Sequence, residues 1–329
     1  MERILEYLPK DRGGIVPSEA ARSTNADVGA GAAWPAKGGV AFENVSLRYR
    51  PGLPLALAET SFTVDAGAKV GIVGRTGSGK STILVALFRL VEIAEGTIRI
   101  DGVDASSLGL ALLRKSLSII PQETVLLEGT ARDNCDPFKE HSDAEVSDAL
   151  AAVGLSRELL HVALEDDSLS GGERQLLALA RALLRRSNVV CFDEATAHVD
   201  AATDQQILRV VHEQFRGATL LAIAHRLHTI IAFDQVIVMD AGRVAEAGAP
   251  AELLERTDGP FAAMTDALGP AAKEELRELA RKGWQAPLSD VPLTPPVSPD
   301  GVSAEAEEDA PGWWSPRRWI SSAAVAEGD

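Results

Sequence analysis

Residues 74–81 read GRTGSGKS and match the spacing G-x-x-x-x-G-K-[ST] without a gap. Glycines let backbone N–H groups close around phosphate oxygens, and the N-terminus of a following helix adds positive partial charge. An apolar strand, KVGIVG, precedes this loop, and a helix is predicted over residues 79–90. The sequence therefore predicts a nucleotide phosphate site, with Lys80 reaching the β- and γ-phosphates and Ser81 binding Mg²⁺. The other residues expected at this site are Gly74, Arg75, Thr76, Gly77, Ser78, Gly79 and Thr82.

A second group of candidate residues is the acidic pair Asp193 and Glu194, which ends the apolar run NVVCF. A buried strand would deliver Asp193 to the carboxyl edge of a sheet, where it could hold Mg²⁺ directly or through water. Glu194 could orient or deprotonate an attacking water. The alternative is a pair of solvated acids at a strand end. Because a complete phosphate loop lies upstream, we favour the metal and water roles.

A third candidate is the stretch EDDSLSGGERQLLALARALL, which starts at Glu165. Ser170, Gly171 and Gly172 stand at the head of a long apolar-periodic run, the pattern of a helix N-terminus that can hold an anion. The chain thus carries two candidate anion sites in one sequence.

Short apolar strands alternate with helical segments from Val40 onward, which predicts an α/β fold with a mostly parallel sheet. Residues 123–187 hold no convincing strand and are predicted to form a helical insertion. Within it, Ser142 and Glu145 have the spacing of a capping box, and Gly154 is a stop signal. The stretch VIVMDAGRVAEAG predicts a hairpin. The predicted strands are VAFENVSLRY, TSFTVD, KVGIVG, TIRIDG, LSIIPQ, NVVCFD, ATLLAIA and QVIVMD.

The chain divides into three predicted parts. Residues 1–39 contain a short helical piece, MERILEYL, and a flexible linker rich in Gly, Ala, Pro and Ser. Residues 40–269 form the folded domain. Residues 270–329 begin with the charged helix AAKEELRELARKG and continue as an acidic, Pro-rich tail that we expect to be disordered. The tail tryptophans could touch a membrane or a partner, but an unstructured tail is favoured; they are Trp313, Trp314 and Trp319.

The composition of the chain disfavours several classes of protein. The net charge of −16 disfavours binding to nucleic acid or anionic lipid. Two cysteines, Cys135 and Cys191, cannot build a disulfide framework, and Cys191 is expected to be a buried thiol; both features indicate a reducing, intracellular setting. No run is apolar and long enough to span a bilayer, and MERILEYLPK lacks the apolar core of a signal peptide.

Taken together, these motifs resemble the nucleotide-binding domain of ABC transporters over residues 40–268. The resemblance implies a P-loop NTPase fold with a RecA-like core, a small antiparallel β subdomain and an inserted helical subdomain. Residues 74–82 resemble the Walker A loop, and residues 169–175, LSGGERQ, resemble the signature motif. The other matching residues are Gln122 of the Q-loop, Asp193 of Walker B, Glu194 as the catalytic glutamate, Asp200 at the end of the D-loop and His225 of the H-loop.

The resemblance also implies roles for these residues toward ATP and Mg²⁺. Gln122 would touch the metal and the water and link the site to the helical block. His225 would contact the γ-phosphate and position Glu194. Tyr49 would stack on adenine, the alternative being a half-buried strand tyrosine. In the family, the segment around Ser170 caps the ATP bound to an opposite domain, which implies a second nucleotide-binding domain, either another copy or the first domain of an exporter.

Finer features are similar to the second ATPase domain of C-subfamily (multidrug-resistance-associated) exporters, among them IIPQETVLLEGT, DNCDPF and IAHRLHTI. MERILEYL resembles the helix that follows the last membrane helix of such exporters. The chain would then work at the cytoplasmic side of a membrane with transmembrane domains that it does not itself contain. Two departures are a short, acidic lead-in to the signature motif, HVALEDDSLSGG, and Glu173 where Gln is commoner.

Two other functions fit the sequence less well. A soluble ABC ATPase of translation or DNA repair would have two such domains or long coiled coils, and this acidic chain has neither. The other is a non-catalytic regulator or an inactive fragment. Against a degenerate site, but not against truncation, stand the intact residues Lys80, Asp193, Glu194 and His225. The histidines expected to be surface or structural residues are His198, His212 and His228.

Overall fold

The computed structural model describes residues 34–165, 168–193, 201–224, 227–256 and 258–284. Three residues of the predicted site, Glu194, Asp200 and His225, lie outside the described residues. So do His198 and the three tryptophans of the tail. No helix in the described ranges is both long enough and apolar enough to cross a bilayer.

The larger of the two main sheets has six strands in the order β12-β11-β3-β10-β9-β6. Its pairs are parallel except for the edge pair of β11 and β12, which forms the predicted hairpin. The mostly parallel sheet is therefore confirmed. The strands are β3 (Lys69–Gly74), β6 (Leu117–Ile120), β9 (Val189–Asp193), β10 (Thr219–Ile223), β11 (Gln235–Asp240) and β12 (Arg243–Gly248).

The second sheet has four antiparallel strands in the order β2-β1-β4-β5. Alternating burial along β2 turns one face toward the core, where Phe42 of β1 stacks on Phe62 with ring centroids 4.5 Å apart. This sheet is the small antiparallel subdomain implied by the resemblance. Its strands are β1 (Val40–Leu47), β2 (Leu57–Val64), β4 (Glu95–Ile100) and β5 (Val103–Asp104).

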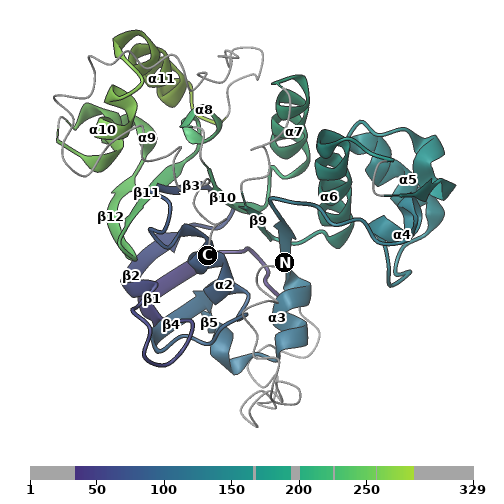
Figure 1. Ribbon diagram of the computed structural model, residues 1–329, viewed down its shortest axis with the longest axis horizontal. Helices are drawn as coiled ribbons and strands as arrows, with labels where there is room; N and C mark the ends of the chain where they lie inside the picture. Colours follow the sequence, from purple (N-terminus) through teal and green to yellow (C-terminus); the bar gives the residue numbers. More distant parts are fainter. Residues whose placement is uncertain (1–33, 166–167, 194–200, 225–226, 257, 285–329) are drawn as a thin grey trace, which may run out of the picture.

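The segment between β6 and β9 forms a helical lobe that projects from the edge of the six-stranded sheet (Figure 1). It contains α4 (Ala131–Cys135), α5 (Asp143–Ala152), a 3-10 turn (Arg157–His161) and α6 (Gly171–Arg185). The remaining helices are α2 (Lys80–Leu87), α3 (Leu110–Ser116), α7 (Ala201–Gln214), α8 (Leu227–Ile230), α9 (Pro250–Glu255), α10 (Pro260–Asp266) and α11 (Pro270–Lys282), with a further 3-10 turn at Ala105–Ser107.

Local signals in the lobe behave as predicted, with one exception. Ser142 caps α5 and forms a full capping box with Glu145. Gly154 adopts a positive φ just beyond that helix. The expectation of a strand-free insertion is wrong in one detail, because β7 (Gly129–Thr130) pairs with β8 (Ala163–Leu164). Strands of two residues are too short to show a period-two pattern.

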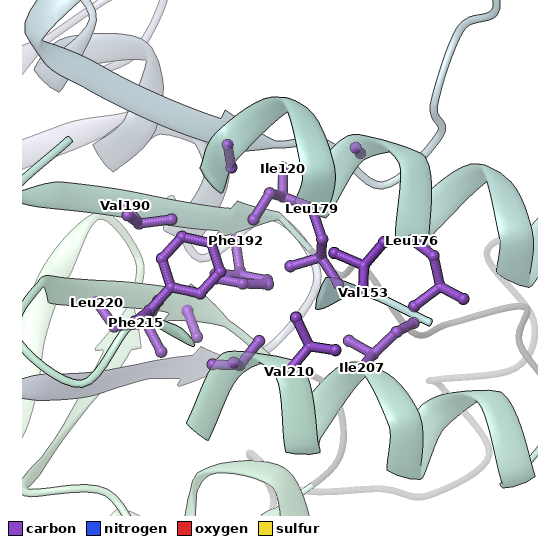
Figure 2. Packing of buried hydrophobic residues seen from close by; sticks show 14 of the residues in the cluster. Ile120, Val153, Leu176, Leu179, Val190, Phe192, Ile207, Val210, Phe215 and Leu220 are labelled. Atoms are coloured by element: carbon purple, nitrogen blue, oxygen red, sulfur yellow. The ribbon is translucent and has the colours of Figure 1, made fainter. Parts of the chain in front are cut away.

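The lobe and the sheet share one hydrophobic core. Leu176 and Leu179 of α6, Ile207 and Val210 of α7, and Phe192 of β9 converge between the helices and the sheet (Figure 2). Leu, Val, Ile and Ala dominate this core, as the low aromatic content predicts. The signature segment at the start of α6 and the phosphate loop at the end of β3 therefore belong to elements that pack in one core.

Both ends of the described chain pack onto the domain. Residues 34–39, which were assigned to the linker, approach Asp101, whose carboxylate accepts backbone N–H bonds at 2.7–2.8 Å. Burial raises the pKa of Asp101, but these hydrogen bonds outweigh it and the net pKa is lowered. At the other end, Leu276 and Leu279 of α11 are buried in the main core. Trp284 then packs on His212, whose Nε2 lies 2.6 Å from the Trp284 carbonyl oxygen.

A buried lysine fastens the start of the central strand. Lys69 is 1% exposed, and its ammonium donates to the carbonyl oxygens of Gly67, Phe215, Arg216 and Ala218. Its backbone N–H donates to Asp234 at 2.8 Å. Burial lowers the pKa of Lys69, and the negative charge of Asp234 acts in the opposite direction. The Lys69 side chain thus holds the loop between α7 and β10 next to the start of β3.

Replacing this lysine tests that role. In Lys69→Met the side chain keeps its length but leaves several buried carbonyls without a donor. We expect the free energy of unfolding, measured by urea denaturation, to fall by about 2–4 kcal/mol. Lys115→Met is the control, because Lys115 makes only an exposed ion pair with Glu140 and should cost less than about 1 kcal/mol. Equal losses in the two variants would contradict the structural role of Lys69.

Candidate active site

The predicted site segments meet at one edge of the six-stranded sheet. In its register, Ile223 of β10 lies beside both Ile72 of β3 and Asp193 of β9. Ile120 of β6 lies beside Phe192, so the segment after β6 also emerges next to Asp193. Because these strands are parallel, their carboxyl ends share one edge. Glu194 and His225 follow two of these strands in the sequence, but both are outside the described residues.

The phosphate loop connects β3 to α2, as its sequence predicts. Lys80 is the first residue of α2 and is 6% exposed. Its ammonium donates to the carbonyl oxygens of Gly74 and Arg75 at 2.8 and 3.0 Å. Thr76 and Gly77 are exposed at the crest of the loop, and Ser81 is exposed beside it. The loop backbone therefore surrounds the Lys80 ammonium, whose positive charge lies where phosphate oxygens are expected to bind.

Two glycines of the loop are required by their surroundings. Gly79 has φ +102°, and a Cβ there would lie 2.7 Å from the Ala56 carbonyl oxygen. Gly74 has φ +147°, and a Cβ there would lie 2.2 Å from the Met239 carbonyl oxygen. Any other residue would strain the backbone and collide with fixed carbonyl groups. These contacts give a structural reason for two of the motif glycines, in addition to the approach of phosphate.

The hairpin turn between β11 and β12 backs the loop, a feature that sequence reasoning missed. Gly242 donates its backbone N–H to the Ser78 carbonyl oxygen at 2.9 Å. The Gly242 carbonyl oxygen accepts from Ala58 N–H and from the Thr60 hydroxyl, at 2.8 and 2.7 Å. The turn thus joins the loop to β2 of the antiparallel sheet. A turn glycine carries no sequence signal for such a distant contact.

Tyr49 lies beside the first turn of α2. It is 43% exposed, and its hydroxyl oxygen is 3.1 Å from the Thr82 hydroxyl oxygen. The alternative of a half-buried strand tyrosine does not apply, because β1 ends at Leu47 and Tyr49 stands in the connection that follows. An exposed aromatic ring next to a phosphate loop is suited to stacking on a base.

Asp193, Ser81 and Gln122 are the residues proposed to bind Mg²⁺ through their side-chain oxygens. Asp193 ends β9 and is half-buried, and Ser81 is exposed at the start of α2. Within the described ranges, no three His, Cys, Asp or Glu side chains gather as a ready-made metal site. Mg²⁺ commonly binds through one or two protein oxygens together with nucleotide phosphates and water. The donor set therefore fits a metal that arrives with its nucleotide.

The cysteines add no reactive group to this site. Cys191 is fully buried in β9, as predicted, and both burial and the charge of Asp193 raise the pKa of its thiol. Burial also raises the pKa of Cys135, to about 12. Both thiols stay protonated at neutral pH and are therefore poor nucleophiles.

The signature segment forms a helix N-terminus in the helical lobe, separate from the phosphate loop. Ser170 caps α6, and its hydroxyl oxygen accepts the Glu173 N–H at 3.3 Å. The Glu173 carboxylate accepts the Ser170 N–H and hydroxyl, at 2.9 and 2.8 Å. Gly172 is buried where a Cβ would lie 2.5 Å from Thr203, whereas Gly171 is exposed. Figure 1 places α6 in the lobe on the far side of β9 from α2.

Gln122 stands two residues beyond β6 and is exposed. Its backbone carbonyl oxygen accepts a hydrogen bond from the side chain of Gln175, a residue of α6 that sequence reasoning placed in the signature motif without a role of its own. The phosphate loop, Asp193 and the segment around Gln122 thus lie at one edge of the six-stranded sheet. The signature helix α6 contacts this edge through the hydrogen bond from Gln175 to Gln122.

Comparisons with known proteins agree with this geometry. Residues 57–197 match the ABC transporter family. The ABC-type transporter cicA of Emericella nidulans is 48% identical over 72% of this chain and 19% of its own length. ATP-binding cassette sub-family C member 2 of Mus musculus is 44% identical over 82% of this chain and 17% of its own length. The chain therefore spans less than a fifth of the length of these relatives.

A solved structure, a bacterial Atm1-family ABC exporter with ATP bound, superposes with a TM-score of 0.67 at 36% identity. The match covers 71% of this chain and 42% of that one. The motifs, the sheet edge that gathers them and these relatives lead to one conclusion: the domain that contains residues 57–197 belongs to the ABC transporter family and is an ATPase domain of that family.

Proposed function

We propose that this chain binds ATP together with Mg²⁺ at residues 74–82 and hydrolyses it when a second nucleotide-binding domain closes over the nucleotide. The observation that carries the proposal is the sheet edge, where the complete phosphate loop with Lys80 and the carboxylate of Asp193 follow β3 and β9, the two parallel strands on either side of β10. Phosphoryl transfer needs little covalent help from the protein, so positioning and charge stabilisation provide most of the catalysis.

Each residue has a distinct task in this proposal. Lys80 leaves the carbonyl oxygens of Gly74 and Arg75 for the β- and γ-phosphates, an exchange that keeps its ammonium hydrogen-bonded throughout. Ser81 and Asp193 would hold the metal, which when bound would offset phosphate charge. Gln122 contacts the metal and the attacking water.

The residues outside the described ranges complete the site. Glu194 follows Asp193 directly and is proposed to orient or deprotonate the water. His225 is proposed to contact the γ-phosphate and to position Glu194. Asp200, at the end of the D-loop, is proposed to be one of the nucleotide-binding residues.

The second domain is needed because the signature segment faces a nucleotide other than the one on its own loop. Ser170, Gly171 and Gly172 stand at the N-terminus of α6, where positive partial charge favours an anion. We propose that this end caps ATP held by the partner domain. A partner that is a second copy would give two equivalent sites by two-fold symmetry, whereas a different domain would give two unlike sites.

The larger protein is proposed to be an exporter of the C-subfamily type, with this chain as its second ATPase domain on the cytoplasmic side of a membrane. The relatives named above are transporters, and sub-family C member 4 of Homo sapiens is a further one at 45% identity. ATP-driven closure of the two domains would drive transmembrane domains that are not part of this sequence. The acidic lead-in at Glu165 is the segment most different from such exporters, so coupling to the membrane domains is where this chain is expected to differ.

The assignment of the catalytic glutamate can be tested directly. A Glu194→Gln chain should bind Mg-ATP as the unaltered chain does, because the amide keeps the side chain's size. Its turnover, measured as phosphate release, should fall by roughly 10²-fold or more, the usual contribution of a general base. Chelating Mg²⁺ should abolish turnover in the unaltered chain. Glu213→Gln, an exposed acid of α7, is the matched control and should leave turnover unchanged. Full turnover in Glu194→Gln would refute the role of Glu194 as the base.

The stacking role of Tyr49 predicts an effect on affinity and not on catalysis. Tyr49→Leu removes the ring, and the Kd for ATP measured by calorimetry should rise by about 5–10-fold, the equivalent of one aromatic contact. The kcat at saturating ATP should change by less than about twofold, since the ring does not touch the transferred phosphate. Tyr49→Phe keeps the ring and removes only the contact with Thr82, so its Kd should stay close to the original. A loss as large in the Phe variant as in the Leu variant would assign the effect to the hydroxyl instead.

A further inference from the structure

A buried threonine of the antiparallel sheet holds the hairpin turn that lies against the phosphate loop. Thr60 of β2 is 0% exposed, and its hydroxyl donates to the Gly242 carbonyl oxygen at 2.7 Å. The same oxygen accepts the Ala58 N–H at 2.8 Å. A carbonyl oxygen has two lone pairs, and here β2 provides a donor for each. The turn between β11 and β12 is therefore fixed to β2, beside which β12 lies (Figure 1).

The hairpin contacts the phosphate loop at both of its ends. Where the loop leaves β3, Gly74 is in register with Met239 of β11. Where the loop enters α2, the Gly242 N–H donates to the Ser78 carbonyl oxygen at 2.9 Å. The loop backbone is thus supported by one hairpin at its first residue and again near its last.

The hydrogen bond to Ser78 determines the direction of the next N–H group. The peptide bond between Ser78 and Gly79 is trans, so its carbonyl oxygen and its N–H point in opposite directions. Because the carbonyl is directed at Gly242, the Gly79 N–H is directed away from the hairpin. Gly79 is the N-cap of α2, where N–H groups lack a partner within the helix and can bind phosphate oxygens.

The turn and the loop also press on one backbone carbonyl of the connection that leads into β2. A Cβ on Gly79 would lie 2.7 Å from the Ala56 carbonyl oxygen, and a Cβ on Gly242 would lie 2.8 Å from the same oxygen. Neither glycine therefore has room to approach Ala56 more closely. The connection that ends at Ala56 is also the one that carries Tyr49. The hairpin turn thus supports the backbone on both sides of the expected nucleotide.

From this geometry we propose that Thr60 and Gly242 are positioning residues for the phosphates of ATP, acting through the peptide between Ser78 and Gly79. The inference rests on the proposed function of residues 74–82. The Thr60 hydroxyl holds the turn, and the turn holds the Ser78 carbonyl, so the Gly79 N–H is oriented before the nucleotide arrives. A preorganised donor binds more tightly than one that must be ordered on binding. Loss of the hydroxyl should therefore weaken ATP binding.

The test compares two buried threonines at opposite ends of the fold. Thr60→Val removes the hydroxyl and keeps a similar shape. The Kd for Mg-ATP, measured by calorimetry well below the unfolding transition, should rise at least about threefold, within the net value of one hydrogen bond. Thr60→Ser keeps the hydroxyl and should restore the original Kd. Thr219→Val is the matched control: Thr219 is also 0% exposed, and its hydroxyl accepts the Gly67 N–H at 2.8 Å, away from the phosphate loop. It should lower the Tm but not change the Kd.

Two glycine variants displace the turn itself. Gly242 has φ +78°, so Gly242→Ala adds backbone strain and a collision with Ala56 that pushes the turn off the loop. Its Kd for Mg-ATP should rise further than that of Thr60→Val. Gly102→Ala is the matched control, because Gly102 has the same φ of +78° in the two-residue turn between β4 and β5, and a Cβ there meets nothing within 4 Å. It adds the same strain without touching the loop and should leave the Kd unchanged.

The outcomes separate positioning from stability. An unchanged Kd in Thr60→Val would overturn the proposal, and so would an equal rise in Thr219→Val or a failure of serine to restore binding. Gly242→Ala overturns it as well if the variant is folded by circular dichroism and binds as tightly as Gly102→Ala. If Gly242→Ala does not fold, the threonine variants decide alone. If the unaltered chain does not bind Mg-ATP, the proposed function fails, and that result is distinct from equal binding by all variants.

Discussion

The parallel pairing of β3, β10, β9 and β6 is the constraint on which the site depends. Each of these strands begins at the same edge of the sheet and ends at the other, so residues far apart in the sequence emerge side by side. Gly74 and Asp193 reach the site only because their strands share this direction. The strands are almost fully buried, and a register shift of one residue would turn every core side chain to the other face of the sheet. The positions of Gly74 and Asp193 are therefore determined by the hydrophobic core.

A chain with a net charge of −16 must still attract a polyphosphate, and the structure shows how the charge is arranged locally. Lys80 is held inside the loop by two carbonyl oxygens, and the N-terminus of α2 adds its partial positive charge. Lys69, at the opposite end of β3, has a structural role, because its ammonium donates to four backbone carbonyl oxygens. Of the two lysines, Lys69 thus stabilises the fold and Lys80 is the one placed to bind phosphate.

Sequence patterns predicted the features that are encoded locally. The phosphate loop, the helices capped by Ser142 and Ser170, and the buried strand that ends at Asp193 each depend on residues close together in the chain. What the sequence did not reveal are single contacts between distant residues. Gly242 meets Thr60 across 182 positions, and Lys69 meets Asp234 across 165. A glycine in a turn and a lysine at the start of a strand are common in proteins. No local sequence pattern therefore indicates that these two residues make long-range contacts.

The two anion sites differ in how ready they are to bind. At the phosphate loop, glycines held against fixed carbonyl groups keep the backbone open, and Lys80 has only to exchange one set of oxygen acceptors for another. At the signature helix, the Glu173 carboxylate already occupies the cap of Ser170. Glutamine at this position could make the same capping box without a charge. A phosphate approaching α6 must therefore displace or tolerate a carboxylate. The phosphate loop is thus the preorganised one of the two candidate anion sites, and the N-terminus of α6 is the one capped by its own carboxylate.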